Sequence, residues 1–204
     1  MKRSNKTNQV IYRLWAPIYD FLLEWFFAPG RRRAHQLLDL KADEEFLIVG
    51  IGTGNDLRCI PDGIAVVGID LSWAMLKQAQ KKAESLPHQP LLVIADAGNL
   101  PFSEAQFDAA MMNLILSVVP QPRLSFREAM RTLGTHGRGV VFDKFLPEDQ
   151  QMTLLRKMLN VVTELMGTDI NRRFEDIIED ADCEVLRDEP VMLNGAYRAI
   201  LMRL

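Results

Sequence analysis

The sequence predicts an α/β fold with a mostly parallel seven-stranded sheet, helices on both faces and an antiparallel hairpin at the C-terminal end. Near-continuous apolar runs alternate with amphipathic helical stretches, a pattern typical of parallel strands buried on both faces. A glycine-rich turn at 50–54 follows the first of these runs. Two strand-like runs near the end are joined through Leu193-Asn194-Gly195, and an Asn-Gly pair favours a tight reversal.

The expected elements follow one another in an order that fits one domain of 204 residues. A helix capped by Ser72 is expected to extend to about Glu84, a second helix to cover 125–133, and a helix-rich stretch to run from 147 to about 180. The expected strands are 46–49, 64–69, 91–95, one within 107–116, 139–142, and the hairpin pair 183–187 and 197–204.

The first 40 residues are expected to form a helical lid that belongs to the same domain as residues 41–204. Aromatic and apolar residues recur there at spacings of three and four, among them Trp15 and Phe26. Ala28-Pro29-Gly30 interrupts the pattern, so a second helix is expected from Arg31 to Leu40. The aromatic side chains either cap the core of the domain or meet lipid or a large apolar substrate.

Composition and charge argue against several classes of protein. The net charge is -3 and the isoelectric point about 5.7, which argues against a dedicated nucleic-acid binder. Two cysteines are too few for a disulfide framework or a cysteine-rich zinc site. The sequence shows neither a signal-peptide pattern nor a run of about 18 apolar residues, so a cytoplasmic protein is expected.

The charge is divided unevenly along the chain. Residues 1–35 contain seven Lys or Arg against two Asp or Glu, a net +5, so the remaining residues carry -8. A basic, aromatic amphipathic helix can lie at an anionic membrane surface. The division therefore favours an N-terminal segment that faces lipid, and a protein at the periphery of the inner membrane surface.

The spacing of the glycine-rich turn separates three classes of ligand. A glycine turn after a first strand lets the backbone approach a ligand at the carboxyl edge of a parallel sheet. A phosphate-binding P-loop needs a Lys that this turn lacks. A dinucleotide fingerprint needs a glycine where Asn55 stands, so an NAD oxidoreductase is disfavoured. The glycines fall instead at Gly50, Gly52 and Gly54.

Carboxylates end the next two expected strands. Asp70 can accept hydrogen bonds from both hydroxyls of a ribose. Asp96 can accept from an adenine amino group, with the N–H of Ala97 facing a ring nitrogen. Either carboxylate could instead cap the helix or loop that follows it. Because the carboxyl ends of parallel strands meet at one edge of a sheet, both are expected to share a site with the glycine turn.

The glycine turn and the two carboxylates resemble the motifs of class I methyltransferases that use S-adenosylmethionine (SAM), and the resemblance covers residues 46–145 in order. It implies a Rossmann-like fold, SAM as the cofactor, S-adenosylhomocysteine (SAH) as its product, and no metal. The residues that it implies for cofactor binding are Gly50, Gly52, Thr53, Gly54, Asp70, Leu71, Asp96, Ala97 and Asn113.

One position departs from that family's pattern. Ile48 stands two residues before the first glycine, where the family usually has an acidic residue. Three alternatives follow: weaker SAM binding, compensation by another carboxylate such as Asp56, or a non-catalytic SAM-binding protein.

Within the family, the chain is similar to small bacterial phospholipid N-methyltransferases, which methylate phosphatidylethanolamine, and to the related quinone methyltransferases. The similarity rests on residues 12–20, on Gly30-Arg31-Arg32 and on residues 115–120. It implies a lipid or small hydrophobic acceptor, with a quinone as the alternative. The candidate catalytic residues are Tyr12, Tyr19 and Asn113, and the candidate substrate-binding residues are Tyr12, Tyr19, Lys144 and Arg172. His35, His88 and His136 lack metal-ligand spacing and are interpreted as structural or surface residues.

Overall fold

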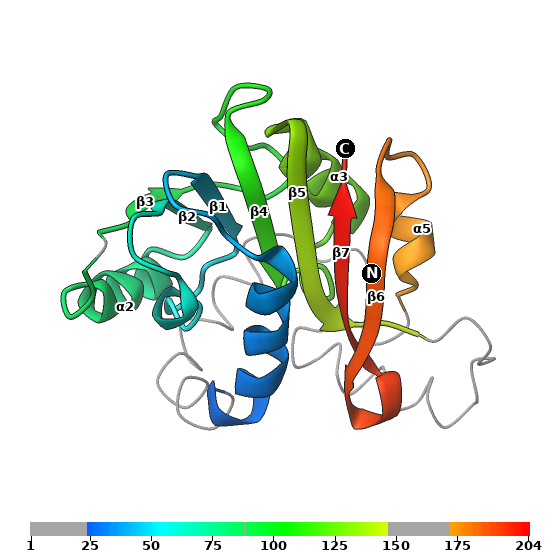
Figure 1. The fold of residues 1–204 in the computed structure, drawn as a ribbon, viewed down its shortest axis with the longest axis horizontal. Coiled ribbons are helices and arrows are strands. Elements are labelled where there is room, and N and C mark those ends of the chain that lie inside the picture. The colour runs from blue at the N-terminus through cyan, green and yellow to red at the C-terminus, as the bar shows by residue number, and fades with distance from the viewer. Residues whose placement is uncertain (1–23, 88, 147–171) are drawn as a thin grey trace.

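A seven-stranded sheet with the strand order β3-β2-β1-β4-β5-β7-β6 forms the centre of the molecule, as Figure 1 shows. The computed structural model describes residues 24–87, 89–146 and 172–204. The first five strands pair in parallel and the last two antiparallel, which confirms the expected fold class. The strands are β1 (Glu45–Val49), β2 (Ala65–Asp70), β3 (Leu91–Ile94), β4 (Phe107–Asn113), β5 (Leu133–Lys144), β6 (Glu184–Met192) and β7 (Tyr197–Arg203).

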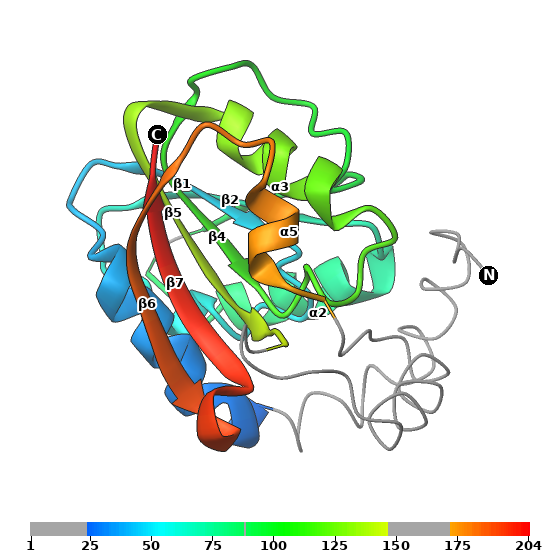
Figure 2. The same ribbon diagram turned by 90° about the vertical axis from the view of Figure 1, so that its right-hand side faces the viewer.

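Helices cover both faces of the sheet because alternate residues of each buried strand point to opposite faces. In β1, Leu47 and Val49 belong to one apolar cluster, and Phe46 and Ile48 to the other. The helices α3 (Pro122–Arg131) and α5 (Phe174–Ile178) cover the first face. Helix α2 (Trp73–Ala83) and a helix of residues 24–38 cover the second, and Figure 2 shows the two layers from the side.

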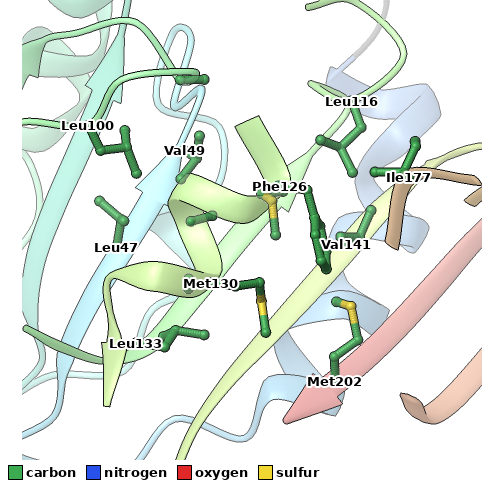
Figure 3. Close-up of a cluster of buried hydrophobic side chains, with 14 of the residues drawn as sticks. Leu47, Val49, Leu100, Leu116, Phe126, Met130, Leu133, Val141, Ile177 and Met202 are labelled. Carbon is green, nitrogen blue, oxygen red and sulfur yellow. The ribbon is translucent and has the colours of Figure 1, made fainter. Parts of the chain in front are cut away.

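The cluster under α3 and α5 includes buried residues of β1, β2, β4, β5 and β7, and Figure 3 shows part of it. Phe126 and Met130 of α3 pack on β4 and β5. The Phe126 ring also packs edge to face on the ring of Phe174 in α5, with the ring centroids 6.0 Å apart. Such apolar burial on both faces is what holds a parallel sheet together. The carboxyl ends of β1 to β4 are therefore fixed relative to one another.

Two helix boundaries follow from local capping chemistry. The Ser72 side chain accepts a hydrogen bond from the Met75 N–H and caps α2, as predicted. Helix α3 begins at Pro122 rather than at the expected residue 125, because proline is well suited to the first turn of a helix. Its Ser125 side chain donates to the Gln121 carbonyl instead of capping the helix.

The expected break at Ala28-Pro29-Gly30 is wrong, because residues 24–38 form one uninterrupted helix that ends two residues before Leu40. Gly30 packs directly on the sheet, where an added Cβ would lie 2.0 Å from the Phe142 ring, whereas Pro29 is exposed on the outer side. Tertiary packing of the buried face thus overrides the local preference of proline and glycine. Of the predicted lid, residues 1–23 lie outside the described residues.

The C-terminal hairpin is confirmed. Strands β6 and β7 pair antiparallel through a short 3-10 turn, η2 (Leu193–Gly195). Asn194 has φ +52° and Gly195 has φ +85°, the left-handed values that these two residue types tolerate best. None of the helices that the structure describes is both long and apolar enough to cross a membrane.

Candidate active site

A cleft opens at the carboxyl ends of β1, β2, β3 and β4, the edge at which parallel α/β sheets bind ligands. Its lining combines the glycine turn, the residues that follow β2 and β3, the end of β4 and one residue of the helix 24–38. The lining residues are Arg31, Gly50, Ile51, Gly52, Thr53, Asn55, Ile69, Asp70, Leu71, Ser72, Met75, Ala95, Asp96, Ala97, Asn113, Leu114, Ile115, Val118, Val119 and Pro120.

The glycine turn presents backbone to this cleft. Gly52 has φ +55°, and a Cβ built on it would meet nothing within 4 Å, so the position faces open space. Gly54 has a different role: a Cβ there would lie 2.9 Å from the Cα of Ala79 in α2, and Gly54 is not among the lining residues. The structure thus places Gly50, Gly52 and Thr53 at the cleft, whereas Gly54 allows the turn to pack against α2.

Asp70 joins the end of β2 to the glycine turn. Its Oδ2 accepts from the Gly52 N–H at 3.0 Å and its Oδ1 from the Ser72 N–H at 2.8 Å. Burial raises the pKa of Asp70 to about 6, although these backbone N–H groups oppose the shift. Each carboxylate oxygen accepts one of these bonds and can accept a second, so the group can bind hydroxyls of a ligand while it holds the turn.

Asp96 and Ala97 line the same cleft after β3, as the sequence predicted. Asp96 Oδ1 accepts from the Gly98 N–H at 2.9 Å, so this carboxylate also orders its own loop. Leu71 lies beside them in the lining. The predicted residues that follow β2 and β3 are thus brought together.

A buried polar cluster, consisting of Arg31, His35, Asp56 and Asn113, adjoins the β4 end of the cleft. Asp56 is 1% exposed and pairs with the Arg31 guanidinium. Asn113 Nδ2 donates to Asp56 Oδ1 at 2.7 Å, and His35 Nε2 lies 3.4 Å from the same oxygen. Burial alone would raise the pKa of Asp56, but Arg31, His35 and Asn113 outweigh it and lower that pKa to about 2. The carboxylate is therefore ionised, paired with Arg31, hydrogen-bonded by Asn113 and close to His35.

The segment after β4, residues 114–120, forms an apolar wall. It supplies Leu114, Ile115, Val118, Val119 and Pro120 to the lining. Two buried or half-buried polar groups fix this segment from outside the cleft. They are Asp143, whose Oδ2 accepts from the Ser117 N–H at 2.9 Å, and Arg172, which donates to the carbonyls of Leu116 and Val119.

The candidate substrate-binding residues are therefore not gathered in the cleft. Arg172 holds the apolar segment, and Lys144 follows Asp143 at the end of β5; neither is among the lining residues. Tyr12 and Tyr19 lie outside the described residues. Asn113 is the candidate catalytic residue that the structure places at the cleft.

The sequence did not identify Arg31 as a site residue, because this side chain entered only through the charge of the N-terminal segment and the similarity at Gly30-Arg31-Arg32. The pairing with Asp56 spans 25 residues and joins two separate elements. His35, interpreted as structural or surface, is buried beside Asp56. In the parts of the chain that are described, no group of three or more His, Cys, Asp or Glu side chains could hold a metal ion.

The residues of the cleft fit SAM. A ribose needs a hydrogen-bond acceptor at the end of the second strand, and Asp70 supplies one. Because Gly52 has no side chain, it leaves space beside the turn that part of a ligand can occupy.

Comparisons with known proteins agree with this geometry. Residues 47–141 match the family described as "Methyltransferase domain". The phosphatidylethanolamine N-methyltransferase of Cereibacter sphaeroides is 29% identical over 188 residues, which cover 91% of this chain and 92% of that protein. The 2-phytyl-1,4-naphtoquinone methyltransferase of a Nostoc species is 31% identical over 160 residues, 72% of this chain and 69% of that protein.

The fold is also shared with solved structures. That of the cyclase SpnF superposes with a TM-score of 0.76 at 20% identity, covering 96% of this chain and 94% of that one. This likeness shows the fold alone, whereas the sequence relatives identify the chemistry. The chain belongs to the class I SAM-dependent methyltransferases.

Proposed function

We propose that this chain N-methylates phosphatidylethanolamine, or a similar membrane lipid that carries an amine. The observation that carries the proposal is the similarity to a phosphatidylethanolamine N-methyltransferase over 91% of this chain and 92% of the relative. The quinone methyltransferase of Nostoc matches 72% of this chain. Agreement over nearly the full length includes segments outside residues 47–141, which match the methyltransferase domain.

The apolar wall at 114–120 supports an acceptor with a hydrophobic part. Five of its residues line the cleft, and a lining of aliphatic side chains excludes water from the reacting atoms. Its attachment to Asp143 and Arg172 keeps the wall in one position. An acyl chain or another apolar group can therefore lie along it while the amine reaches the β4 end of the cleft.

SAM, when bound, supplies an activated methyl group, so the protein needs mainly to orient the acceptor and exclude water. The amine of the lipid must be unprotonated before it attacks. We propose Tyr12 and Tyr19, which lie outside the described residues, as the groups that fold over the cleft and hydrogen-bond the amine. Asn113, 5% exposed at the end of β4, is proposed to lie close to the site of transfer.

The basic, aromatic N-terminal segment is proposed to dock on anionic lipid. Residues 1–35 carry a net charge of +5 against -8 for the rest. Basic residues near an anionic membrane surface contribute about 1 kcal/mol each. Flotation with vesicles tests this: the full chain should float with anionic vesicles at low salt, whereas a variant that lacks residues 1–9 should float less.

A quinone is the second candidate acceptor, because the Nostoc relative named for a naphthoquinone substrate is 31% identical. A flat quinone would fit the same apolar wall. The two acceptors differ in chemistry, since a quinone is methylated at carbon and has no amine.

Transfer of a labelled methyl group decides between them. The protein is incubated with methyl-labelled SAM and either phosphatidylethanolamine vesicles or a demethylated naphthoquinone in detergent. Label in the lipid fraction supports the proposal. Label in the quinone alone, or no transfer to either acceptor by a protein that binds SAH, rejects it. The Asp70→Asn variant, which should lose cofactor affinity, is the control for contaminating activity.

A further inference from the structure

Arg31 and Asn113 mark one end of the cleft, and Asp70 and Asp96 mark the other. The strand order β3-β2-β1-β4 places Asp96 after the first of these strands and Asp70 after the second. Asn113 ends β4, on the far side of β1, and Arg31 reaches this end through its pairing with Asp56. A ligand that spans the cleft therefore has one end at two carboxylates and the other at a guanidinium and an amide.

The far end holds unsatisfied polar atoms. Five buried side-chain atoms in the described part of the chain have no hydrogen-bond partner there, and four of them belong to the buried polar cluster. Two of these four are on residues that line the cleft, Nε of Arg31 and Oδ1 of Asn113. A buried donor or acceptor without a partner costs free energy, so a ligand that satisfies both atoms gains affinity.

Asp56 decides which atoms remain for a ligand. It pairs with Nη1 of Arg31 and accepts from Nδ2 of Asn113 at 2.7 Å. The amide of Asn113 is thereby oriented with its nitrogen toward Asp56 and its oxygen available as an acceptor. The Arg31 guanidinium is held in place by Asp56, and its Nε–H has no hydrogen-bond partner among the described residues. Asp56 thus orients two residues that line the cleft: Arg31 as a cationic donor and Asn113 as a neutral acceptor.

Ile48 stands where the family usually has an acidic residue. This side chain is fully buried in the cluster on the α2 face, paired in register with Met111 of β4. The carboxylate on this face is instead Asp56, whose charge is matched by Arg31. Asp56 is not among the residues that line the cleft, whereas its partner Arg31 is.

We infer that Arg31 binds the α-carboxylate of the cofactor and that Asn113 Oδ1 accepts from its α-ammonium group. This rests on the use of SAM, whose ribose and adenine can donate hydrogen bonds to the carboxylates that follow β2 and β3. The methionyl end, which carries one carboxylate and one ammonium, then extends toward β4. A guanidinium prefers a carboxylate partner, and an amide oxygen accepts from an ammonium.

Calorimetry with three ligands tests the assignment on the wild-type chain. SAH carries both charged groups, decarboxylated SAH keeps only the ammonium, and 5′-methylthioadenosine lacks both. SAH should bind about tenfold to hundredfold more tightly than decarboxylated SAH, as expected for a charge-assisted hydrogen bond. Equal affinity for these two ligands would overturn the inference while leaving SAM use intact. Binding of none of them would overturn the proposed cofactor use itself.

Variants of Arg31 test whether this side chain causes the preference for SAH over decarboxylated SAH. Arg31→Gln should lose most of the preference for SAH over decarboxylated SAH and leave the affinity for 5′-methylthioadenosine unchanged. Arg31→Lys should recover part of it, since it keeps the charge. Arg32→Gln is the matched control, because Arg32 is the exposed neighbour on the same helix. If Arg31→Gln instead changes only the KM for the acceptor, Arg31 binds the acceptor's phosphate and the inference fails.

Discussion

The carboxylate of Asp70 accepts a hydrogen bond from the backbone N–H of Gly52 at 3.0 Å, which ties the end of β2 to the turn that follows β1. The same carboxylate is the group that the sequence predicts to bind the ribose of the cofactor. If this prediction holds, formation of the turn and recognition of the ribose depend on the same side chain. Its buried position makes its ionisation sensitive to pH near neutrality.

Cofactor affinity should fall in mildly acidic solution. Burial raises the pKa of Asp70 to about 6, and the protonated form offers fewer acceptors to the ribose hydroxyls. The affinity for SAH should be constant above about pH 7 and decrease roughly tenfold for each unit below about pH 6. Calorimetric titrations between pH 5 and pH 8 measure this dependence.

The Asp70→Asn variant controls for other titrating groups. It should bind SAH weakly, and its affinity should not vary over the same range of pH. A wild-type affinity that stays flat down to pH 5 would show that the Asp70 carboxylate does not need its charge to bind the ligand.

Gly52→Ala should abolish cofactor binding without unfolding the protein. The new Cβ would meet no protein atom within 4 Å and would project into the cleft, and φ +55° adds a backbone cost of about 1–2 kcal/mol. Gly63→Ala is the matched control, since Gly63 also has a positive φ, +84°, and open space around its Cβ. Gly63 is not among the lining residues.

Both variants should lose similar stability in urea, whereas only Gly52→Ala should lose SAH binding by calorimetry. Equal binding by the two variants would mean that the ligand does not lie against the glycine turn.

Asp56→Asn should destabilise the fold by about 3–5 kcal/mol, because it leaves the Arg31 charge without its buried partner. The pKa of Asp56 is lowered from 3.8 to about 2, so its ionised form stabilises the fold. That contribution is complete above about pH 4 and is lost as the pH falls through about 2. The difference in unfolding free energy between wild type and variant should therefore be constant from pH 5 to pH 8.

Urea unfolding of this variant and of Asp62→Asn, which changes an exposed carboxylate, provides the comparison. Asp62→Asn should change stability by less than about 0.5 kcal/mol. A similarly small effect at Asp56 would mean that the ion pair adds nothing beyond an amide in that position.

Arg172→Gln should loosen the apolar wall rather than remove a contact with the acceptor. Arg172 donates to the carbonyls of Leu116 and Val119, at 2.8 Å for the latter. Loss of these charge-assisted bonds should speed amide hydrogen exchange in residues 115–119 about tenfold. Exchange measured by mass spectrometry should show no such change in β1.

Arg173→Gln, at the exposed neighbouring position, is the control for the charge alone. If Arg172→Gln raises the KM for the lipid while exchange in the wall stays unchanged, the original interpretation of Arg172 as a substrate-binding residue is the better one.

The sheet and the cofactor side of the cleft were predictable because both depend on local patterns. Apolar runs mark the buried strands, and Asp70 and Asp96 come directly after two of them. The continuous helix through Pro29 and Gly30 was not predictable, since it depends on the close approach of Gly30 to Phe142, far away in the sequence. Arg31 was missed for the same reason, because its significance comes from Asp56 on another element.

The sequence indicates Asp56 only as a carboxylate that could compensate for Ile48. In the structure Asp56 is not among the lining residues but contacts Arg31 and Asn113, which are. No sequence spacing indicates such a relation, because the partners come from a helix, a turn and a strand end. Only the packed fold brings them together.

The crystal structure of the complex with SAH is the most direct test of the account. We predict that the ribose hydroxyls lie within about 3 Å of the Asp70 carboxylate and that the α-carboxylate lies within about 3 Å of the Arg31 guanidinium. A ligand in the opposite direction, with its amino-acid end at β3, would contradict the account. So would an α-carboxylate bound by residues other than Arg31.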